Sequence, residues 1–413
     1  MKNLKGLLSS IFLFIRNPFF IALFLLTGSY QQAFEKQTNS LTMESDLRFI
    51  IKQSVKFNDQ YADFLERRLD SLLVRRRFNG SVLVAHEGHA VYNKSMGYSR
   101  YTPSTPFAQE NNIFQLASVG KQFTAFTVLM LYERGLIDLD DEVYRHINGF
   151  PYPEITVRHL LNHTSGLQSY FYVIEHFWKH NHLPTHQDML DLFVERSMPL
   201  NFTPGRRFSY SNTGYAFLAM LVESVTGQGF ACFVKENIFQ PLRMSDSFVY
   251  EPGLNLEELA EQKNLSFGYE RAGRRLREIP VDYLDGITGD KGIFSSTEDL
   301  LKWDNALENN LIVSGETKAM AFDNGRLRSG YRVSYGFGLR LRTQQGQQTQ
   351  YHNGWWRGFR TAYVRLPDNT LIVILNNTNA SINGLENHIR SIINENPHPR
   401  FDQKRIYDLA IVN

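Results

Sequence analysis

The sequence predicts an α/β protein of the α+β type, in which an antiparallel sheet is flanked by helices and carries an inserted all-helical lobe. Residues 81–98 have the pattern of a β-hairpin, and residues 360–375 have the pattern of a second one around the turn at 367–370. Between them the pattern is mainly helical. Because strands occur near both ends of the chain, we expect one sheet built from both ends.

Several further elements follow from local patterns. Residues 58–77 place apolar side chains at helical spacing, which predicts an amphipathic helix on the sheet. Residues 112–116 are a short extended segment, and residues 123–134 are apolar on nearly every face, as in a helix buried all round. A helix start of the S-x-x-D type lies at 296–299, and a closing helix is expected over 382–393.

Composition excludes several classes of protein. The chain has 413 residues, with 44 Lys+Arg against 42 Asp+Glu, and charged residues make up 21%. This length exceeds the roughly 250–300 residues of a single growing core, so we expect two lobes. The balance of charge argues against a disordered chain and against nucleic acid as a partner. Cys232 is the single cysteine, so neither an internal disulfide nor a cysteine-rich metal site is expected.

The first 30 residues have the pattern of an export signal. Lys2, Lys5 and Arg16 precede the apolar run at 19–26, and small polar residues follow it. The segment could also stay attached as a membrane anchor, although neither of its apolar halves reaches the ~20 residues of a spanning helix. We therefore expect an exported protein that is periplasmic or extracellular, with membrane anchoring by this segment as an alternative.

The expected domain organisation places one folded domain between two extensions. Its sheet lobe is made of two separate segments and its helical lobe lies between them in sequence. The boundaries are a signal peptide or membrane anchor at 1–30, an N-terminal extension at 31–57, a domain at 58–396 with its sheet lobe at about 58–115 and 331–396 and its helical lobe at about 116–330, and a tail at 397–413.

Ser118 and Lys121 form an S-x-x-K pair where an extended segment is expected to turn into the buried helix. Residues three apart share a helix face, so the amine can lie beside the hydroxyl. Burial and the positive field of a helix start favour a neutral amine that could take the serine proton. A helix cap followed by a surface lysine is the simpler explanation of such a short motif. However, the apolar neighbours Val119 and Phe123 make an exposed position unusual for this lysine.

Two further motifs lie downstream in a familiar order. Tyr210-Ser211-Asn212 follows a Pro-Gly stretch, and His352-Asn353-Gly354 precedes two tryptophans. The order S-x-x-K, Y-x-N, H-x-G resembles the serine β-lactamase and penicillin-binding-protein superfamily, in its class C-like, esterase and D-peptidase branch. The resemblance covers about residues 60–395, and the flanking segments 160–167 and 289–296 are also similar to this superfamily.

The resemblance implies a β-lactamase/transpeptidase-like fold and a role for each motif residue. Ser118 would be the acylated nucleophile, and Lys121 would assist in removing its proton. Tyr210 would be the partner base, which requires nearby cations to stabilise a phenolate. Asn212 would hydrogen-bond the substrate amide or the amine of Lys121.

The third motif departs from the superfamily pattern. His352 would stand where β-lactamases have a lysine that holds the substrate carboxylate, and histidine is mostly neutral at pH 7. Gly354 would let its strand approach the substrate closely, while the backbone N–H groups of Ser118 and Trp355 would form the oxyanion hole. Relatives with histidine here are commonly esterases or peptidases and amidases that act on D-residues.

These features together predict an exported serine hydrolase that forms an acyl-enzyme at Ser118 and hydrolyses an ester or amide. The substrate would be a small ester or amide or a cell-wall peptide, and no cofactor is implied. Two alternatives remain open at this point. One is a genuine β-lactamase, and the other is a non-catalytic relative that binds cell-wall peptides. The intact S-x-x-K and Y-x-N motifs argue against the second, because a binding module needs no nucleophile–base pair.

Two other features need an explanation. His176, His180, His182 and His186 form a local cluster, of which the first two could share a helix face and bind a metal ion. A polar and aromatic loop or lid near the site is the simpler explanation. Lys291 could contact substrate, but we expect a solvated loop lysine.

Overall fold

The structure is a computed structural model that describes residues 59–273 and 275–395. The predicted leader at 1–30, the extension at 31–57 and the tail at 397–413 lie outside these described residues, so their predictions are untested.

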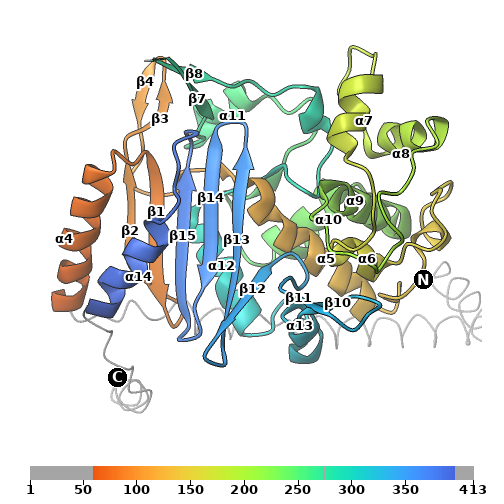
Figure 1. Ribbon diagram of the computed structural model, residues 1–413. Coiled ribbons are helices and arrows are strands. Elements are labelled where there is room, and N and C mark those ends of the chain that lie inside the picture. Colours follow the sequence, from red (N-terminus) through yellow and green to blue (C-terminus); the bar gives the residue numbers. More distant parts are fainter. Residues whose placement is uncertain (1–58, 274, 396–413) are drawn as a thin grey trace, which may run out of the picture. The chain divides into compact units, whose positions relative to one another are not determined.

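An antiparallel sheet of six strands lies at the centre of the described chain (Figure 1). Its order is β12-β13-β14-β15-β1-β2, so a strand from near the start of the chain pairs with one from near its end. Both predicted hairpins are present. The strands are β1 Gly80–His86, β2 His89–Met96, β12 Arg340–Gln344, β13 Gln347–Trp356, β14 Phe359–Arg365 and β15 Thr370–Asn376.

The inner strands are buried on both faces. In β1, Leu83 and Ala85 belong to the larger hydrophobic core, whereas Val82 and Val84 belong to a second core on the opposite face. Successive side chains of a strand point to opposite faces, so a strand covered on both sides is a continuous apolar run. This burial explains why the segment lacks the polar alternation of a half-exposed strand.

Helices cover the two faces of the sheet, as Figure 1 shows. Helix α4 (Asp59–Arg75) packs on β2 and against α14 (Leu385–Glu395) on one face. Helix α12 (Thr297–Glu308) packs on β1 and β15 from the other face. The predicted helix start is confirmed, because the side chain of Ser296 caps α12 by accepting a hydrogen bond from Asp299 N at 3.2 Å.

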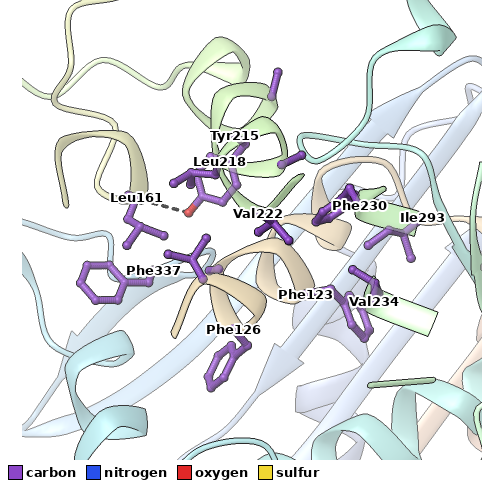
Figure 2. Packing of buried hydrophobic residues seen from close by; sticks show 14 of the residues in the cluster. Phe123, Phe126, Leu161, Tyr215, Leu218, Val222, Phe230, Val234, Ile293 and Phe337 are labelled. Carbon is purple, nitrogen blue, oxygen red and sulfur yellow. Dashed lines mark hydrogen bonds between the residues drawn. The ribbon is translucent and has the colours of Figure 1, made fainter. Parts of the chain in front are cut away.

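Helix α5 (Lys121–Glu133) is the central helix of the helical part and is buried along nearly its whole length, as its apolar sequence predicts. Figure 2 shows Phe123 and Phe126 of this helix among side chains of neighbouring helices, including Tyr215 and Val222. The surrounding helices are α6 Val157–Leu161, α7 Tyr170–Phe177, α8 His186–Glu195, α9 Asn212–Thr226, α10 Phe230–Val234, α11 Leu256–Gln262 and α13 Gly315–Ala321.

Short strands complete the described fold. Three of them form a small sheet that leads into α5, namely β5 Phe114–Gln115, β9 Ile293–Ser295 and β6 Phe248–Val249. The remaining pairs are β3 Tyr98–Tyr101 with β4 Ser104–Pro106, β7 Tyr269–Ala272 with β8 Arg275–Glu278, and β10 Gly325–Arg326 with β11 Arg332–Val333. Within residues 59–273 and 275–395, no single helix has the length and apolar character to cross a membrane. One pair bent by 82°, Asn212–Thr226 with Phe230–Phe239, meets that test by length and composition alone.

Candidate active site

The nucleophile candidate lies at a strained turn between a strand and a helix. Strand β5 leads through a short 3-10 helix at Ala117–Gly120 into α5, and Leu116 N donates a hydrogen bond to Ile293 O at 2.8 Å. Ala117 has a φ of 50°, a left-handed conformation that costs a non-glycine residue on the order of 1–3 kcal/mol. Ser118 follows it, half-buried, and lines a cleft of about 1210 Å³.

Lys121 lies directly beside this serine. Its side chain is fully buried, and Nζ donates hydrogen bonds to Ser118 Oγ at 3.1 Å and to the backbone oxygen of Asp290 at 2.6 Å. This Nζ atom is also 5.1 Å from the ring centroid of Tyr210. The amine is therefore held between the hydroxyl it could activate and the aromatic ring of the second motif.

Tyr210 and Asn212 lie at the start of α9 and line the same cleft. Ser211 between them caps this helix through its side chain, and its backbone N–H donates to His163 Nδ1 at 3.1 Å. The hydroxyl of Tyr210 and Oδ1 of Asn212 are buried, yet they have no hydrogen-bond partner within the described residues. Two polar atoms thus remain available to a substrate or to the reacting groups.

His352 of β13 is a neutral imidazole whose ring centroid lies 5.9 Å from that of Tyr210. Its Nδ1 lies 2.8 Å from the carbonyl oxygen of Asn353 and so carries the proton, while Nε2 accepts from the hydroxyl of Tyr335 at 3.2 Å. Burial, followed by the positive charge of Lys121, lowers the pKa of His352 from 6.5 to about 3. This agrees with the expectation that His352 cannot replace the lysine charge of β-lactamases.

Gly354 allows β13 to lie against the turn that carries Ser118. A Cβ atom at this position would be 2.1 Å from Thr361 Oγ1 and 2.4 Å from Leu116 O. The hydroxyl of Thr361 donates to that same carbonyl oxygen at 2.7 Å, which ties β14 to the turn. The third motif and the nucleophile are therefore in contact through backbone atoms.

The backbone of β13 beyond Tyr351 forms an open edge beside the cleft. Strand β12 pairs with it only from Gln347 to Tyr351. A two-residue turn joins β13 to β14, so Trp356 and Phe359 form a hydrogen-bonded pair. Hydrogen-bonded and non-hydrogen-bonded pairs alternate along antiparallel strands, so the backbone N–H groups of Asn353 and Trp355 point away from β14. The N–H of Trp355 is thus unpaired by any described strand, as an oxyanion donor requires. The Trp355 side chain is 67% exposed.

The structure overturns the expectation for Lys291. Its side chain is only 3% exposed, and it lines the cleft beside Trp356. The reason is the path of its loop, which is pressed between two buried helices: Thr124 of α5 donates to Gly289 O at 2.7 Å, and a Cβ at Gly289 would be 2.5 Å from Tyr215 O of α9. Gly289 and Gly292 flank this loop, and both have a positive φ. Their presence in the sequence was the signal that the backbone of the loop lies close to neighbouring elements.

The histidine cluster is spread over separate elements. Helix α7 ends at Phe177, so His176 and His180 do not share a helix face. His186 starts α8 and its Nδ1 lies 2.9 Å from Glu223 Oε2. Among the described residues, no group of three or more His, Cys, Asp or Glu side chains is arranged to hold a metal ion. The same part of the chain does wall the cleft, because Phe171 of α7 stacks on Trp356 with centroids 5.2 Å apart.

Two buried rings beside Tyr210 had been assigned no role from the sequence. His163 lies 4.3 Å from Tyr210 between ring centroids, and Tyr335 lies 4.5 Å from His163. Burial lowers the pKa of His163 well below 6.5, so this ring is also neutral. Tyr335 belongs to no motif and reaches the site only because its chain segment folds under β13, a tertiary effect without a local signal.

We expect the Tyr210→Phe variant to acylate Ser118 about 10²–10⁴-fold more slowly, because the ring would remain while the proton acceptor is lost. The free energy of unfolding should change little, since the hydroxyl has no hydrogen-bond partner within the described residues. A time course of covalent labelling with a fluorophosphonate measures the acylation rate. Tyr331→Phe, at a tyrosine that is 69% exposed, is the matched control. Labelling of the Tyr210 variant at the parent rate would exclude this residue as the base.

The buried neutral state of His352 predicts a loss of stability in acid. Its folded pKa of about 3 lies below the unfolded value of 6.5, so the unfolded chain binds the proton first as the pH falls. Stability is therefore lost between pH 6.5 and about 3. Urea unfolding at pH 7 and pH 5 should show a smaller loss for His352→Gln than for the parent, whereas the exposed His180→Gln should behave like the parent. If the free energy of unfolding fell equally in all three proteins between pH 7 and pH 5, His352 would not be the group responsible.

Comparison with known proteins gives consistent matches. The Beta-lactamase family profile matches residues 64–392. Penicillin-binding protein 4* of Bacillus subtilis (strain 168) is 35% identical over 325 residues, which are 76% of this chain and 71% of that protein. A D-aminopeptidase of Gluconobacter oxydans (strain 621H) is 24% identical over 326 residues, which are 77% of this chain but only 59% of the aminopeptidase.

Comparison with solved structures also finds penicillin-binding proteins. The crystal structure of a penicillin binding protein from Bacillus halodurans superposes with a TM-score of 0.66 and 25% identity, and the match covers 79% of this chain and 98% of that one. This likeness confirms the β-lactamase/transpeptidase-like fold. Together, the family profile over most of the chain, the related sequence and the related structure show that this protein belongs to the beta-lactamase family of serine hydrolases.

Proposed function

We propose that this protein is an exported hydrolase that forms an acyl-enzyme at Ser118 and transfers the acyl group of an amide or ester to water. The observation that carries the proposal is the 3.1 Å contact between Lys121 Nζ and Ser118 Oγ, in a buried position beside Tyr210. A non-catalytic binding protein has no need of a buried amine held against a serine hydroxyl.

The arrangement supports a two-step reaction. Ser118 Oγ forms a bond to the substrate carbonyl carbon while its proton passes to Tyr210 in the phenolate form, beside the amine of Lys121. The carbonyl oxygen gains negative charge and faces the backbone N–H groups of Ser118 and Trp355, donors typically worth about 3–4 kcal/mol each. The bond to the leaving group then breaks as that group takes the proton. A water molecule attacks the resulting ester, returns the serine hydroxyl and releases the acid.

The cleft also suggests what the substrate carries. Arg340 of β12 lines the cleft with its guanidinium carbon 5.3 Å from the ring centroid of Tyr210, and none of the ion pairs among the described residues involves it. His352, being neutral, offers no competing charge. A carboxylate beside the scissile bond would pair with this arginine. We therefore favour short peptides that end in a D-residue with a free carboxyl group, and amides or esters of similar shape.

A substrate panel tests the proposal. The purified protein is incubated with p-nitrophenyl butyrate, D-alanine p-nitroanilide, a peptide ending in D-alanyl-D-alanine with a free or amidated carboxyl end, a chromogenic cephalosporin and a fluorescent penicillin. Product formation and the intact mass are followed together. We expect turnover of the ester and of at least one D-amide, with the acyl mass on Ser118, and a preference for the free carboxyl group.

Other results would change the assignment. Rapid cephalosporin hydrolysis as the dominant activity would show a β-lactamase. Neither an adduct nor turnover with any compound would leave a binding protein. An adduct on a residue other than Ser118 would refute the proposed nucleophile.

Export rests on the N-terminal pattern of basic residues before the apolar run at 19–26. Fractionation of cells that produce the full chain, followed by N-terminal sequencing, tests it. A mature chain that begins near residue 31 outside the cytoplasm supports a cleaved leader, and an intact chain in the membrane fraction supports an anchor. Intact protein in the cytoplasm would contradict export.

A further inference from the structure

The loop that holds Lys121 also carries two buried charges that the reaction above does not use. Asp290 accepts a hydrogen bond from Lys121 through its backbone oxygen at 2.6 Å. Its carboxyl group is 1% exposed, and the neighbouring Lys291 is 3% exposed. Charged groups are seldom buried to this degree unless they are paired, because removal from water is costly. Two such groups beside the catalytic lysine need a reason.

The two charges are fixed in place from several directions. The hydroxyl of Tyr170 lies 3.1 Å from each carboxylate oxygen of Asp290. Lys291 Nζ donates to Ile287 O at 2.5 Å and lies 4.0 Å from Asp290 Oδ1. The loop itself is anchored to α5 by Thr124. Asp290 is thus a rigid link between the buried Tyr170 of α7 and the amine of Lys121.

The charges act on Lys121 in opposite directions. A carboxylate close to an amine stabilises its protonated form, and a second ammonium nearby opposes that effect. Burial raises the pKa of Asp290 and lowers that of Lys291, while the attraction between them works against both changes. The other titratable or charged groups that face this group of residues are Ser118, His163, Tyr170, Tyr210, Tyr215, Asp285, Arg340, His352 and Arg357.

We propose that Asp290 and Lys291 are positioning residues that form a charge-compensated support for Lys121, in which the aspartate holds the amine against Ser118 and the second lysine offsets its charge. The proposal deepens the acyl-transfer function proposed above and rests on it. It predicts that the two residues have opposite effects on the pH at which Lys121 can assist the serine. A merely structural pair would lose activity on substitution without such a shift.

The test is the pH dependence of Ser118 acylation by a fluorophosphonate, measured on the full chain. Asp290→Asn removes the negative charge, so the acid side of the rate profile should move to lower pH by about 1 unit. Lys291→Met removes the positive charge, so the acid side of the rate profile should move to higher pH by about the same amount. The double variant should return close to the parent profile. Lys318→Met, at a partly buried lysine that donates to Leu307 O and Glu308 O, is the matched control and should leave the profile unchanged.

Tyr170→Phe separates the effect of the two charges from the effect of disturbed packing. Tyr170→Phe removes the hydrogen bonds to Asp290 but keeps both charges, so it should slow acylation without moving the profile. Circular dichroism of every variant confirms the folded state before the rates are compared.

Three results would overturn the proposal. The single variants could lose rate equally with unmoved profiles, which would make the pair structural. The profiles of both could move in the same direction. Lys291→Met could instead raise KM for a carboxylate substrate with an unmoved profile, which would make it a substrate contact. Failure of the parent to be labelled, with Ser118→Ala also unlabelled, would refute the proposed function itself and is distinguishable from all three.

Discussion

Ser118→Ala is expected to lower kcat/KM for ester and amide substrates by at least about 10⁴-fold, because the bond to the acyl group can no longer form. The hydroxyl it removes accepts a hydrogen bond from Lys121 at 3.1 Å, and the side chain is only half-buried. The fold should therefore persist, with a free energy of unfolding within about 1 kcal/mol of the parent. Initial rates, fluorophosphonate labelling and urea unfolding measure the three quantities.

Ser165→Ala is the matched control for this experiment. Ser165 is a buried serine in another motif-like segment, but Gln168 stands where a lysine would be needed. Within the part of the chain that the structure describes, its hydroxyl makes only a long contact, accepting from Leu167 N at 3.4 Å. The control should keep close to parent activity. If the Ser118 variant kept its activity and adduct formation while the control lost them, the nucleophile would have been assigned to the wrong serine.

Gly354→Ala is expected to have the second-largest effect, on stability and activity together. The added methyl group would lie 2.4 Å from the backbone oxygen of Leu116 and 2.1 Å from Thr361 Oγ1. The backbone cannot move aside without displacing the turn that holds Ser118, so we expect a loss of about 3 kcal/mol in the free energy of unfolding. Acylation should fall even in the fraction that remains folded, because β13 and the nucleophile would separate. Urea unfolding and labelling at low temperature measure the two effects.

Gly229→Ala provides the comparison. This glycine has a φ of −59°, and an added Cβ would meet no atom within 4 Å. Its substitution should change the free energy of unfolding by no more than about 1 kcal/mol, because the weaker helix cap and the reduced entropy of the unfolded chain oppose each other. A Gly354 variant as stable and as fast as the Gly229 variant would show that close contact between β13 and the turn is not required.

The sequence predicted those parts of the site that local geometry determines. Ser118 and Lys121 lie together because three residues nearly complete one helical turn, a spacing that holds wherever the helix lies in the fold. Tyr210, Asn212 and His352 were expected near them only through a resemblance, because no local rule brings such distant segments together. The structure places Ser118, Tyr210, Asn212 and His352 around one cleft, and Lys121 is buried beside Ser118.

The errors have physical causes. Lys291 was expected in solvent because a lysine in a Gly-rich loop usually is, but α5 and α9 bury that loop. The strand β13 was expected only through the resemblance, because its sequence is rich in glutamine and lacks apolar alternation. It lies near the edge of the sheet, where one side faces the cleft and few apolar contacts are needed. The face of each buried strand could not be assigned, since a run that is apolar throughout has no period.

The pairing of β1 with β15 has a consequence for the synthesis of this protein. The two strands come from near opposite ends of the chain, and the wall formed by His352 and Gly354 reaches Ser118 only when the last strands have joined the sheet. Such distant pairings form slowly and late. A ribosome-bound or C-terminally truncated chain should therefore present Ser118 without the wall that completes the site, so the site forms only after the last strands have paired.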